Sequence, residues 1–415
     1  MNIFVAFLGS KDICGWPYKS FDFDAQIQKI KKTLTNIENI NNEKVEFFGF
    51  KHIENDRNIV ESYKEMEKAD GLIIATITAE FASLGPSISK LCEMDIPTIV
   101  YNIPFSVYYD GFATLYHSGV KALLVSSSDP KDLQQALIAV NTVVKLKKLN
   151  LLIVRDLDHD YSKIEKDMLD PARWKGPKYV RMIKEIFGVS LIFAESNELL
   201  KCYDSVDDKM VENDLVKIDE KTIKEPPKTD LFRAVKMYYA MKKLMEERNC
   251  NGITVDCLSY IREKKLPISP CYGLSRLLRE GVPAGCEGDV DSTITLAISL
   301  YLTQIPGFMG DPVLDHANKQ LTLAHCTSSC RLCTPQKDIE DVDYFFRTHN
   351  ESHSDVGIQA FMKPNLPVTV MKIMHSGFAQ FIGQPTVFTS TSFIGYHLLC
   401  YESKTSTTVV DDHDD

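Results

Sequence analysis

The chain has 415 residues, more than one ordinary hydrophobic core accommodates, and this length suits two or three domains. Its composition of 44% hydrophobic and 25% charged residues is typical of a globular protein. The net charge is −10, and the lysines and arginines are dispersed rather than striped. This balance disfavours nucleic acid and an anionic membrane as partners, whereas a neutral small-molecule substrate fits at least as well.

The N-terminal residues Met1–Gly9 lack a basic flank and predict a first strand rather than a signal peptide. No apolar run approaches the roughly 18 residues that a membrane helix needs. The eleven cysteines are odd in number and scattered through apolar segments, which is typical of reduced thiols. We therefore expect a soluble cytoplasmic protein of enzyme size.

Strand and helix patterns alternate through residues 1–148, the first predicted domain. The expected strands are 1–8, 44–48, 71–76, 96–101 and 122–126, and the expected helices are 23–37, 60–69, 87–94 and 131–147. Because the strands are continuously apolar and helices separate them, the pattern predicts a doubly wound parallel sheet.

Residues 149–305 repeat this alternation and form the second predicted α/β domain. The expected strands are 150–154, 190–194, 252–257 and one near Ala284, and the expected helices are 179–187, 197–203, 231–248 and 272–279. The charged stretch 217–228, which contains two prolines, is expected to be a surface connection.

The pattern changes after about Ile305. Segments 313–315 and 321–324 flank Asn318 and predict a hairpin, and 356–361 and 368–373 predict further strands. The fold class is therefore α/β, with two doubly wound parallel-sheet domains followed by a small, mostly β domain over 306–404. The acidic, polar end, 405–415, is predicted to be a disordered tail.

Two acidic clusters and a histidine lie close together in the sequence, within 286–289, 308–311 and 323–326. Separated by one helix and a hairpin, they can place carboxylate oxygens and an imidazole around one divalent ion. Glu287 and Asp289 follow an apolar strand end, where α/β sheets bind ligands. Asp289 has a second interpretation, because it can cap the helix that begins near Ser292.

Asp311 and His325 also have ordinary structural interpretations. Asp311 follows Gly310 at the approach to the predicted hairpin, where an aspartate is common without any function. His325 ends an apolar strand, where a lone histidine is more often a packed, hydrogen-bonded residue than a ligand.

Cys326, Cys330 and Cys333 have the spacing C-x3-C-x2-C, which permits three thiolates to meet on one loop. Iron–sulfur enzymes use this spacing at the start of a large barrel, which the β-rich remainder of this chain does not match. The same cysteines with His325 are alternative ligands for a structural zinc. Neither a glycine-rich phosphate loop nor Gly-x-Ser-x-Gly is present, so dinucleotide binding and hydrolase chemistry are unsupported.

A series of short motifs extends from the second predicted domain towards the C-terminus. They are Gly252–Cys257, Ser269–Cys271, Gly281–Asp289, Phe308–Asp311, Leu323–Thr327, Asn350–Ser352, Gly357–Gln359 and Gly383–Pro385. Taken together, they resemble the L-fucose isomerase and L-arabinose isomerase superfamily, nearest its fucose isomerase-like branch. The similarity covers most of the chain to about Ser392, is weaker over 71–104, and is most specific from Gly252 to Thr327.

The resemblance implies an aldose–ketose isomerase that binds Mn²⁺, or another divalent cation, between its second and third domains. The family holds the metal with a glutamate, an aspartate about 24 residues later and a C-terminal histidine. Glu287 and Asp311 match the first two positions, since 311 − 287 = 24. His397 is the nearest candidate for the third ligand, although it lies much earlier than the family's histidine.

The same resemblance implies the catalytic roles and partners. The ion would bind O1 and O2 of an open-chain monosaccharide, while Glu287 and Asp311 move a proton between C1 and C2 through an enediol. Family members commonly assemble as trimers or hexamers. Because the C-terminus departs from the family pattern, a catalytically inactive homologue that binds sugar or assembles with relatives is the alternative. A cysteine-ligated metalloprotein centred on Cys326, Cys330 and Cys333 is a third hypothesis.

Overall fold

The structure is a computed structural model in which the chain divides into two compact units, Met1–Lys145 and Leu146–Asp415. It describes all residues except 13–21, 79–83, 103–116, 118, 157–176, 319, 334–338, 350–351, 362–365, 369, 374–378, 382–385, 389–395 and 398–415. The predicted second and third domains both fall in the second unit, and the boundary between them stays a prediction. The predicted tail, 405–415, lies outside the described residues.

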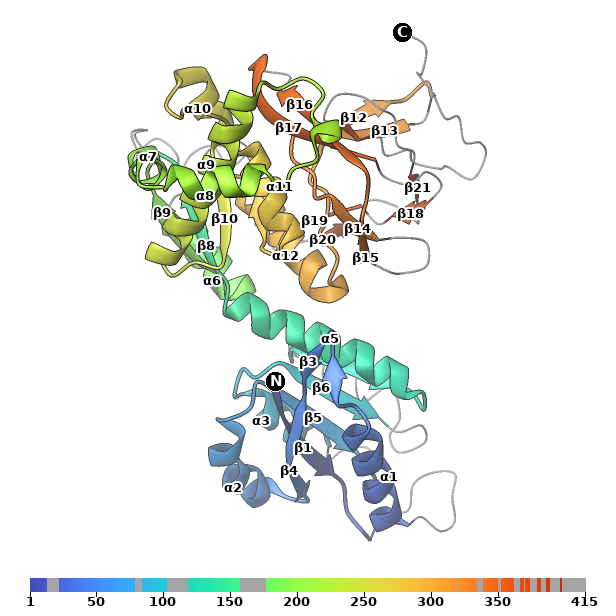
Figure 1. The fold of residues 1–415 in the computed structure, drawn as a ribbon. Coiled ribbons are helices and arrows are strands. Elements are labelled where there is room, and N and C mark those ends of the chain that lie inside the picture. Colours follow the sequence, from blue (N-terminus) through green and yellow to red (C-terminus); the bar gives the residue numbers. More distant parts are fainter. Residues whose placement is uncertain are drawn as a thin grey trace. The chain divides into compact units, whose positions relative to one another are not determined.

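Unit 1 is built on a five-stranded parallel sheet in the order β4-β1-β5-β6-β7 (Figure 1). Its strands are β1 (Asn2–Leu8), β4 (Glu46–Ile53), β5 (Gly71–Thr76), β6 (Thr98–Asn102) and β7 (Ala122–Ser126), with a short hairpin of β2 (Asn39–Ile40) and β3 (Glu43–Lys44). Strands β5 and β6 are buried along their whole length, which explains their unbroken apolar sequences.

Helices cover both faces of this sheet. They are α1 (Phe23–Thr35), α2 (Asp56–Met66), α3 (Leu84–Cys92) and α5 (Pro130–Lys147). The odd-numbered residues of β1 from Ile3 to Phe7 pack with α1 and α5 in one hydrophobic core. The even-numbered residues from Phe4 to Leu8 pack with α2 and α3 in another. This alternation gives the doubly wound arrangement that the sequence predicts for the first domain.

Unit 2 contains a four-stranded parallel sheet in the order β11-β10-β8-β9. Its strands are β8 (Asn150–Val154), β9 (Ser190–Ala194), β10 (Gly252–Val255) and β11 (Ala284–Gly285). The helices are α6 (Pro177–Phe187), α7 (Ser196–Asp204), α8 (Asp208–Leu215), α9 (Lys228–Glu247), α10 (Cys257–Glu263), α11 (Cys271–Arg279) and α12 (Val290–Thr303), with a 3₁₀ turn η3 (Glu220–Thr222). Leu152 and Val154 pack with α7, α9 and α11, whereas Leu151 and Ile153 pack with α6 and α12.

Beyond α12 the described chain consists of antiparallel strands. A three-stranded sheet joins β12 (Asp311–Asp315), β13 (Gln320–Ala324) and β22 (Tyr396–His397). The remaining pairs are β14 (Arg331–Cys333) with β15 (Ile339–Asp341), β16 (Tyr344–His349) with β17 (Ser354–Ala360), β18 (Leu366–Val368) with β21 (Thr386–Phe388), and β19 (Met371–Ile373) with β20 (Ala379–Phe381). The predicted hairpin around Asn318 is present as β12–β13.

The β-rich segment shares a hydrophobic core with the α/β part of unit 2. Phe346 of β16 and Val356 and Ile358 of β17 belong to the same buried cluster as Tyr272 and Leu274 of α11. Figure 1 shows β17 beside α9 and α11, and the contacts of β17 with both helices agree with that view. One continuous core therefore spans what the sequence predicts as two domains.

Two local predictions differ from the structure. The strand expected over 252–257 ends at Val255, because Asp256 turns away to begin α10 and forms an ion pair with Arg155 at 2.7 Å. The expected surface connection over 217–228 contains the turn η3. It also docks on β16 through an isolated bridge from Ile223 to Phe346.

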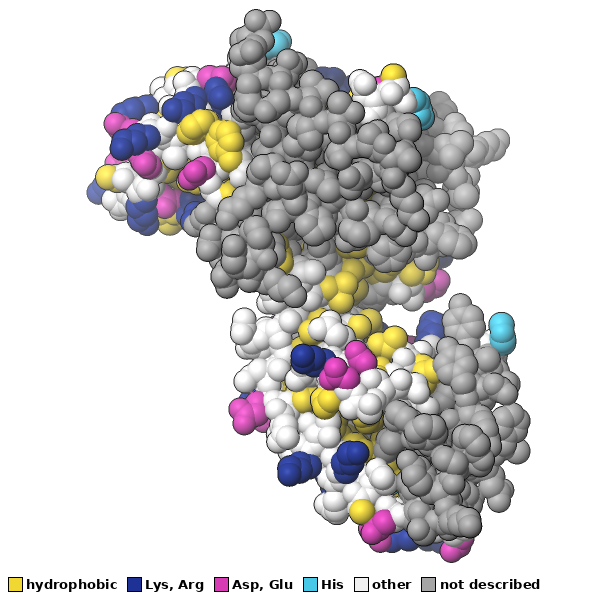
Figure 2. Space-filling view, turned by 90° about the vertical axis from the view of Figure 1, so that its right-hand side faces the viewer, with side chains coloured by type: hydrophobic (Ala, Val, Ile, Leu, Met, Phe, Trp, Pro, Cys, Tyr) yellow, Lys and Arg dark blue, Asp and Glu magenta, His cyan; other side chains and the backbone are white. Residues whose placement is uncertain are grey.

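No described helix combines the length and apolar character that crossing a bilayer requires. On the face drawn in Figure 2, the described lysines and arginines are intermixed with aspartates and glutamates rather than gathered in one patch.

Candidate metal centre

Glu287, Asp311 and His325 meet at one place in unit 2, with their ligand atoms all within 4.8 Å of one another. Glu287 follows β11, Asp311 begins β12, and His325 comes directly after β13. In the antiparallel hairpin, Asp311 pairs with Ala324, so the register places the aspartate beside the histidine. The carboxyl end of β11 supplies the glutamate, at the sheet edge where α/β proteins bind ligands.

The chain turns sharply at Glu287. Glu287 has φ +62° and Gly288 has φ +65°, so two successive residues adopt the left-handed conformation. The turn is held by the Gly288 N–H, which donates to the Val255 carbonyl at 2.9 Å. A non-glycine residue in this conformation costs about 1 kcal/mol, and such strain is concentrated at functional sites. The turn aims the Glu287 side chain towards the β12–β13 hairpin.

The His325 ring is held from one side, and no described residue hydrogen-bonds to its other side. The side chain is buried, and its Nδ1 lies 2.7 Å from the Thr327 hydroxyl oxygen and 3.2 Å from the Thr327 backbone nitrogen. Its Nε2 is buried without a hydrogen bond to any described residue and lies 3.6 Å from Glu287 Oε1, beyond hydrogen-bond range. The Thr327 backbone N–H donates to Nδ1, so the neutral ring carries its proton on Nε2, and Nε2 can bind a cation only after giving up that proton.

The electrostatics of this site act on the imidazole in two directions. Burial lowers the pKa of His325, whereas the carboxylates of Glu287 and Asp311 raise it, and the net shift of the pKa is upwards. The two acidic groups therefore favour a positive charge at the position of Nε2. A proton on the ring can supply that charge, and so can a cation held between the three side chains.

The structure brings two of the three predicted ligands together and leaves the third open. Glu287 and Asp311 converge, while the backbone of His397 pairs with Leu323 of β13 and its side chain lies outside the described residues. His325 joins the group although a packed role was the more ordinary expectation. The sequence shows that His325 ends a strand. It does not show that this strand pairs with the strand that begins at Asp311.

Asp289 of the first acidic cluster and Asp315, the last residue of β12, have structural roles. Asp289 caps α12 by accepting hydrogen bonds from the Ser292 backbone N–H at 2.8 Å and hydroxyl at 2.7 Å, and it contacts Lys372 Nζ at 2.8 Å. Asp315 accepts hydrogen bonds from the backbone N–H groups of Ala317 and Asn318 in the hairpin turn. The capping interpretation of Asp289 is therefore confirmed.

Of the predicted cysteine set, the structure describes the side chains of Cys326 and Cys330 and does not group them. Cys326 Sγ lies with those of Cys271 and Cys286, all within 4.8 Å of one another. Cys330 is buried in the core shared with α11 and belongs to no such group among the described residues. The side chain of Cys333 lies outside the described residues. Sequence spacing failed here because the partners of Cys326 come from distant segments.

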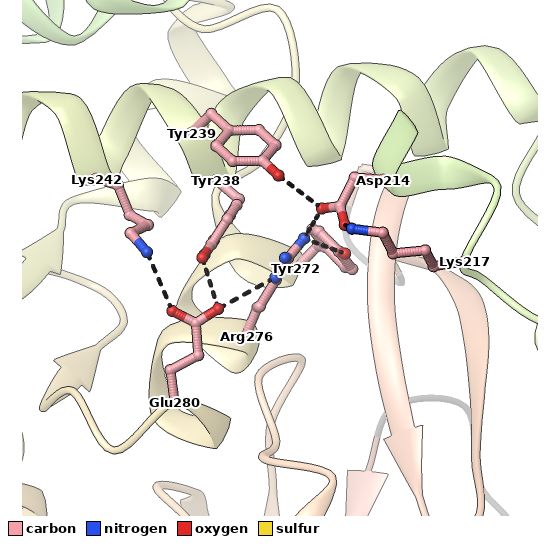
Figure 3. A network of polar contacts seen from close by, with 8 residues as sticks. All are labelled: Asp214, Lys217, Tyr238, Tyr239, Lys242, Tyr272, Arg276 and Glu280. Carbon is pink, nitrogen blue, oxygen red and sulfur yellow. Dashed lines mark hydrogen bonds and ion pairs between the residues drawn. The ribbon is translucent and has the colours of Figure 1, made fainter. Parts of the chain in front are cut away.

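A pocket of about 650 Å³ lies elsewhere in unit 2, and none of the three candidate ligands lines it. Its wall carries the polar network of Figure 3, in which Arg276 of α11 bridges Asp214 of α8 and Glu280. Tyr239 donates to Asp214 at 3.1 Å, and Tyr238 donates to Glu280 at 2.6 Å. These contacts tie α8, α9 and α11 together, so this network has a structural role.

Comparison with known proteins gives one partial match in sequence. No family model matches the chain. A sulfoquinovose isomerase from Clostridium sp. (strain MSTE9) is 28% identical over 152 residues, which is 35% of this chain and 33% of that enzyme.

Solved structures give matches of low quality. One is an ABC transporter solute-binding protein from Actinobacillus succinogenes 130z with bound D-allose, 12% identical over 72% of this chain and 91% of that chain, with a TM-score of 0.18. Another is from Agrobacterium vitis with bound D-fucose, 13% identical over 72% and 90%, with a TM-score of 0.19. TM-scores this low establish neither a shared fold nor a shared ligand. The finding from all the comparisons is a similarity to about a third of one sugar isomerase.

Proposed function

We propose that the protein is a metal-dependent sugar isomerase that interconverts an aldose and a ketose. The observation that carries this proposal is the convergence of Glu287, Asp311 and His325 from three separate segments. The partial similarity to a sulfoquinovose isomerase supports the same class of reaction.

The three side chains suit Mn²⁺ or a similar divalent cation. Two carboxylates and one imidazole supply the oxygen and nitrogen atoms that such ions prefer. The buried Nε2 of His325 has no hydrogen-bond partner among the described residues, and a bound cation would remove the energetic cost of leaving it unpaired. His397 stays a prediction as a further ligand, since its backbone lies beside β13.

The reaction requires moving a proton between C1 and C2 of an open-chain sugar. When bound, the cation supplies Lewis-acid polarisation of the sugar oxygens. Either Glu287 or Asp311 removes the proton from one carbon as a general base, and the resulting carboxylic acid returns it to the other carbon of the enediol. A second proton moves between O1 and O2, so that the carbonyl group changes place. The Glu287 side chain is 27% exposed and Asp311 is exposed, so a substrate can reach both groups.

The substrate class is a monosaccharide, and the name of the similar enzyme makes sulfoquinovose one candidate. L-Fucose and L-arabinose are the others, from the family that the motifs resemble. Which sugar fits depends on side chains around the three ligands. Assembly as a trimer or hexamer stays a prediction.

Incubating the purified protein with Mn²⁺ and these aldoses, and measuring ketose formation, tests the proposal. We expect one aldose to be converted, and Glu287→Gln and Asp311→Asn to reduce the rate at least 100-fold. Asp315→Asn is the matched control, because it changes the same residue type at the other end of β12. Ketose formation that survives both substitutions would refute the assigned roles. Stoichiometric metal and sugar binding without turnover would favour the inactive homologue.

A further inference from the structure

We propose that Cys271, Cys286 and Cys326, with Cys257 as a fourth ligand, form a thiolate site for a soft or borderline cation of the Zn²⁺ class. This site is distinct from the carboxylate–histidine site and does not depend on the proposed isomerase activity.

The sulfur atoms of three cysteines converge inside unit 2, and a fourth sulfur contacts one of them. The Sγ atoms of Cys271, Cys286 and Cys326 lie within 4.8 Å of one another, and those of Cys271 and Cys326 are 3.3 Å apart. Cys257 Sγ is 3.0 Å from Cys286 Sγ. All four are free thiols, since a disulfide would bring two sulfurs to about 2.05 Å.

These separations suit a tetrahedral thiolate site. With zinc–sulfur bonds of about 2.3 Å, the ligand sulfurs of such a site are about 3.8 Å apart. The two short contacts, 3.0 and 3.3 Å, would each have to open by less than an ångström. Cys257 Sγ does not lie within 4.8 Å of all three other sulfurs, so its side chain has to turn inward to become the fourth ligand.

The four ligands come from the ends of different elements. Cys257 begins α10 after β10, Cys271 begins α11, Cys286 follows β11, and Cys326 follows His325 at the end of β13. The sheet's carboxyl edge, the first turn of α11 and the hairpin thus face one another across the cluster. A cation held there would link the α/β part of unit 2 to its β-rich segment.

The ordinary alternative is that these cysteines are small hydrophobic residues of the core, a role that buried thiols often have. Cys257, Cys271 and Cys286 are each at most 1% exposed, which such packing also requires. Packing alone does not require three sulfurs to gather and a fourth to contact one of them, because a thiol is only a weak hydrogen-bond donor and acceptor. The imidazole of buried His349 also contacts the Cys271 thiol, so polar groups extend beyond the sulfurs.

The two proposed sites are adjacent but differ in chemistry. Cys286 directly precedes Glu287, and Cys326 directly follows His325. Soft sulfur ligands select zinc-like ions, whereas carboxylates suit Mn²⁺ and Mg²⁺. A cation among the cysteines would therefore position Glu287 and His325 without occupying the carboxylate–histidine site.

Metal analysis of the full-length protein tests the proposal. The wild type is exposed to Zn²⁺, desalted and analysed for bound zinc, and the same is done with Cys271→Ser and Cys326→Ser. Cys202→Ser is the matched control, because Cys202 is a buried free cysteine of another segment. Glu287→Gln reports whether zinc instead occupies the carboxylate–histidine site. Titration of the wild type with Co²⁺ reports the ligand type directly, since thiolate ligands give a charge-transfer band in the near ultraviolet.

We expect stoichiometric zinc in the wild type, Cys202→Ser and Glu287→Gln, and at least tenfold weaker binding in Cys271→Ser and Cys326→Ser. The Co²⁺ protein should show the thiolate charge-transfer band. A wild type without that band would overturn the proposal even if the serine variants fail to fold. Zinc that is retained by both serine variants, or lost only from Glu287→Gln, would also overturn it.

Discussion

His325 Nε2 lies 3.6 Å from Glu287 Oε1, although the whole of α12 and the β12–β13 hairpin separate the two residues in sequence. The imidazole is buried and held by Thr327, whereas the carboxylate is partly exposed at a strained turn. One partner is therefore rigid and inside, and the other faces the solvent. This is the geometry expected of a site that anchors a cation from the interior and leaves its outer side open to a ligand.

Thr327→Val removes the hydroxyl that positions the His325 ring and replaces it with a methyl group of similar size. We expect Mn²⁺ affinity to fall about 10- to 100-fold, because groups that orient a metal-bound histidine contribute on this scale. Isothermal titration with Mn²⁺ measures the change. Thr322→Val, on strand β13 but outside the ring's contacts, serves as the control. Equal affinity of Thr327→Val and wild type would show that the ring needs no such support.

The turn at Glu287 predicts an unusual order of stability. At φ +62°, glycine avoids the strain that any side chain incurs. We expect Glu287→Gly to be more stable to unfolding than Glu287→Ala by about 1 kcal/mol, although glycine normally destabilises. Urea unfolding in the presence of a chelator compares the two variants, which lack the carboxylate equally. Alanine that is as stable as glycine, or more stable, would contradict a strained turn.

The regular elements are predictable from the sequence because their physical causes are local. The expected bounds of β5, β7, β8 and β9 match the structure residue for residue, since each is a short apolar run between polar boundaries. Helix α8 was missed, because its charged sequence in Asp208–Leu215 has only a weak apolar stripe. The separation of a third domain was inferred from a change of pattern, which cannot reveal that Phe346 and Tyr272 share a core.

The candidate site was only partly predictable. Glu287 and Asp311 were identified through resemblance, whereas their approach to His325 depends on hairpin register and on the turn after β11. The convergence of Cys271 and Cys286 on Cys326 was missed. These cysteines lie on separate elements, so their spacing in the sequence does not show that they are close in space.

Gly285→Ala tests how tightly the strand before Glu287 is packed. An added Cβ would overlap Thr293 Oγ1 and lie 3.0 Å from Thr293 Cβ. The Thr293 hydroxyl donates to the Asp289 carbonyl at 2.6 Å and cannot turn away without losing that bond. We expect a loss of about 1–3 kcal/mol in unfolding free energy and weaker metal binding.

Thr293→Ala provides the matched background for that substitution. Because it removes the overlapping hydroxyl, Gly285→Ala should cost less in the Thr293→Ala protein than in the wild type. Thermal unfolding of the four proteins in this double-mutant cycle measures the difference. Additive losses would show that Thr293 is not the obstacle.

Asp214 is expected to contribute to acid sensitivity. Burial raises the pKa of Asp214, but the hydrogen bond from Arg276 and its positive charge lower it by more. The pKa of Asp214 is therefore below its ordinary value of 3.8. A lowered pKa in the folded state gives stability that is present above the unfolded pKa and lost as the pH falls through the folded value. At neutral pH we expect Asp214→Asn to cost about 1–3 kcal/mol, because it leaves the Arg276 charge without its partner.

Urea unfolding at a series of pH values from about 7 down to 3 measures this contribution. The difference between wild type and Asp214→Asn should be constant near neutrality and shrink below about pH 4. Asp208→Asn, which removes an ion pair with Lys236 from the surface of α8, should change little at any pH. A difference that grows as the pH falls would contradict the assigned sign.

Titration of the purified protein with Mn²⁺, compared among wild type, Glu287→Gln, Asp311→Asn and His325→Gln, tests the central claim most directly. We predict stoichiometric binding by the wild type and at least 100-fold weaker binding by each variant, because each removes one of three ligands. The same titration of His397→Gln decides whether that residue is a further ligand. Wild-type protein that binds no Mn²⁺, or three variants that bind it as tightly as the wild type, would contradict the claim.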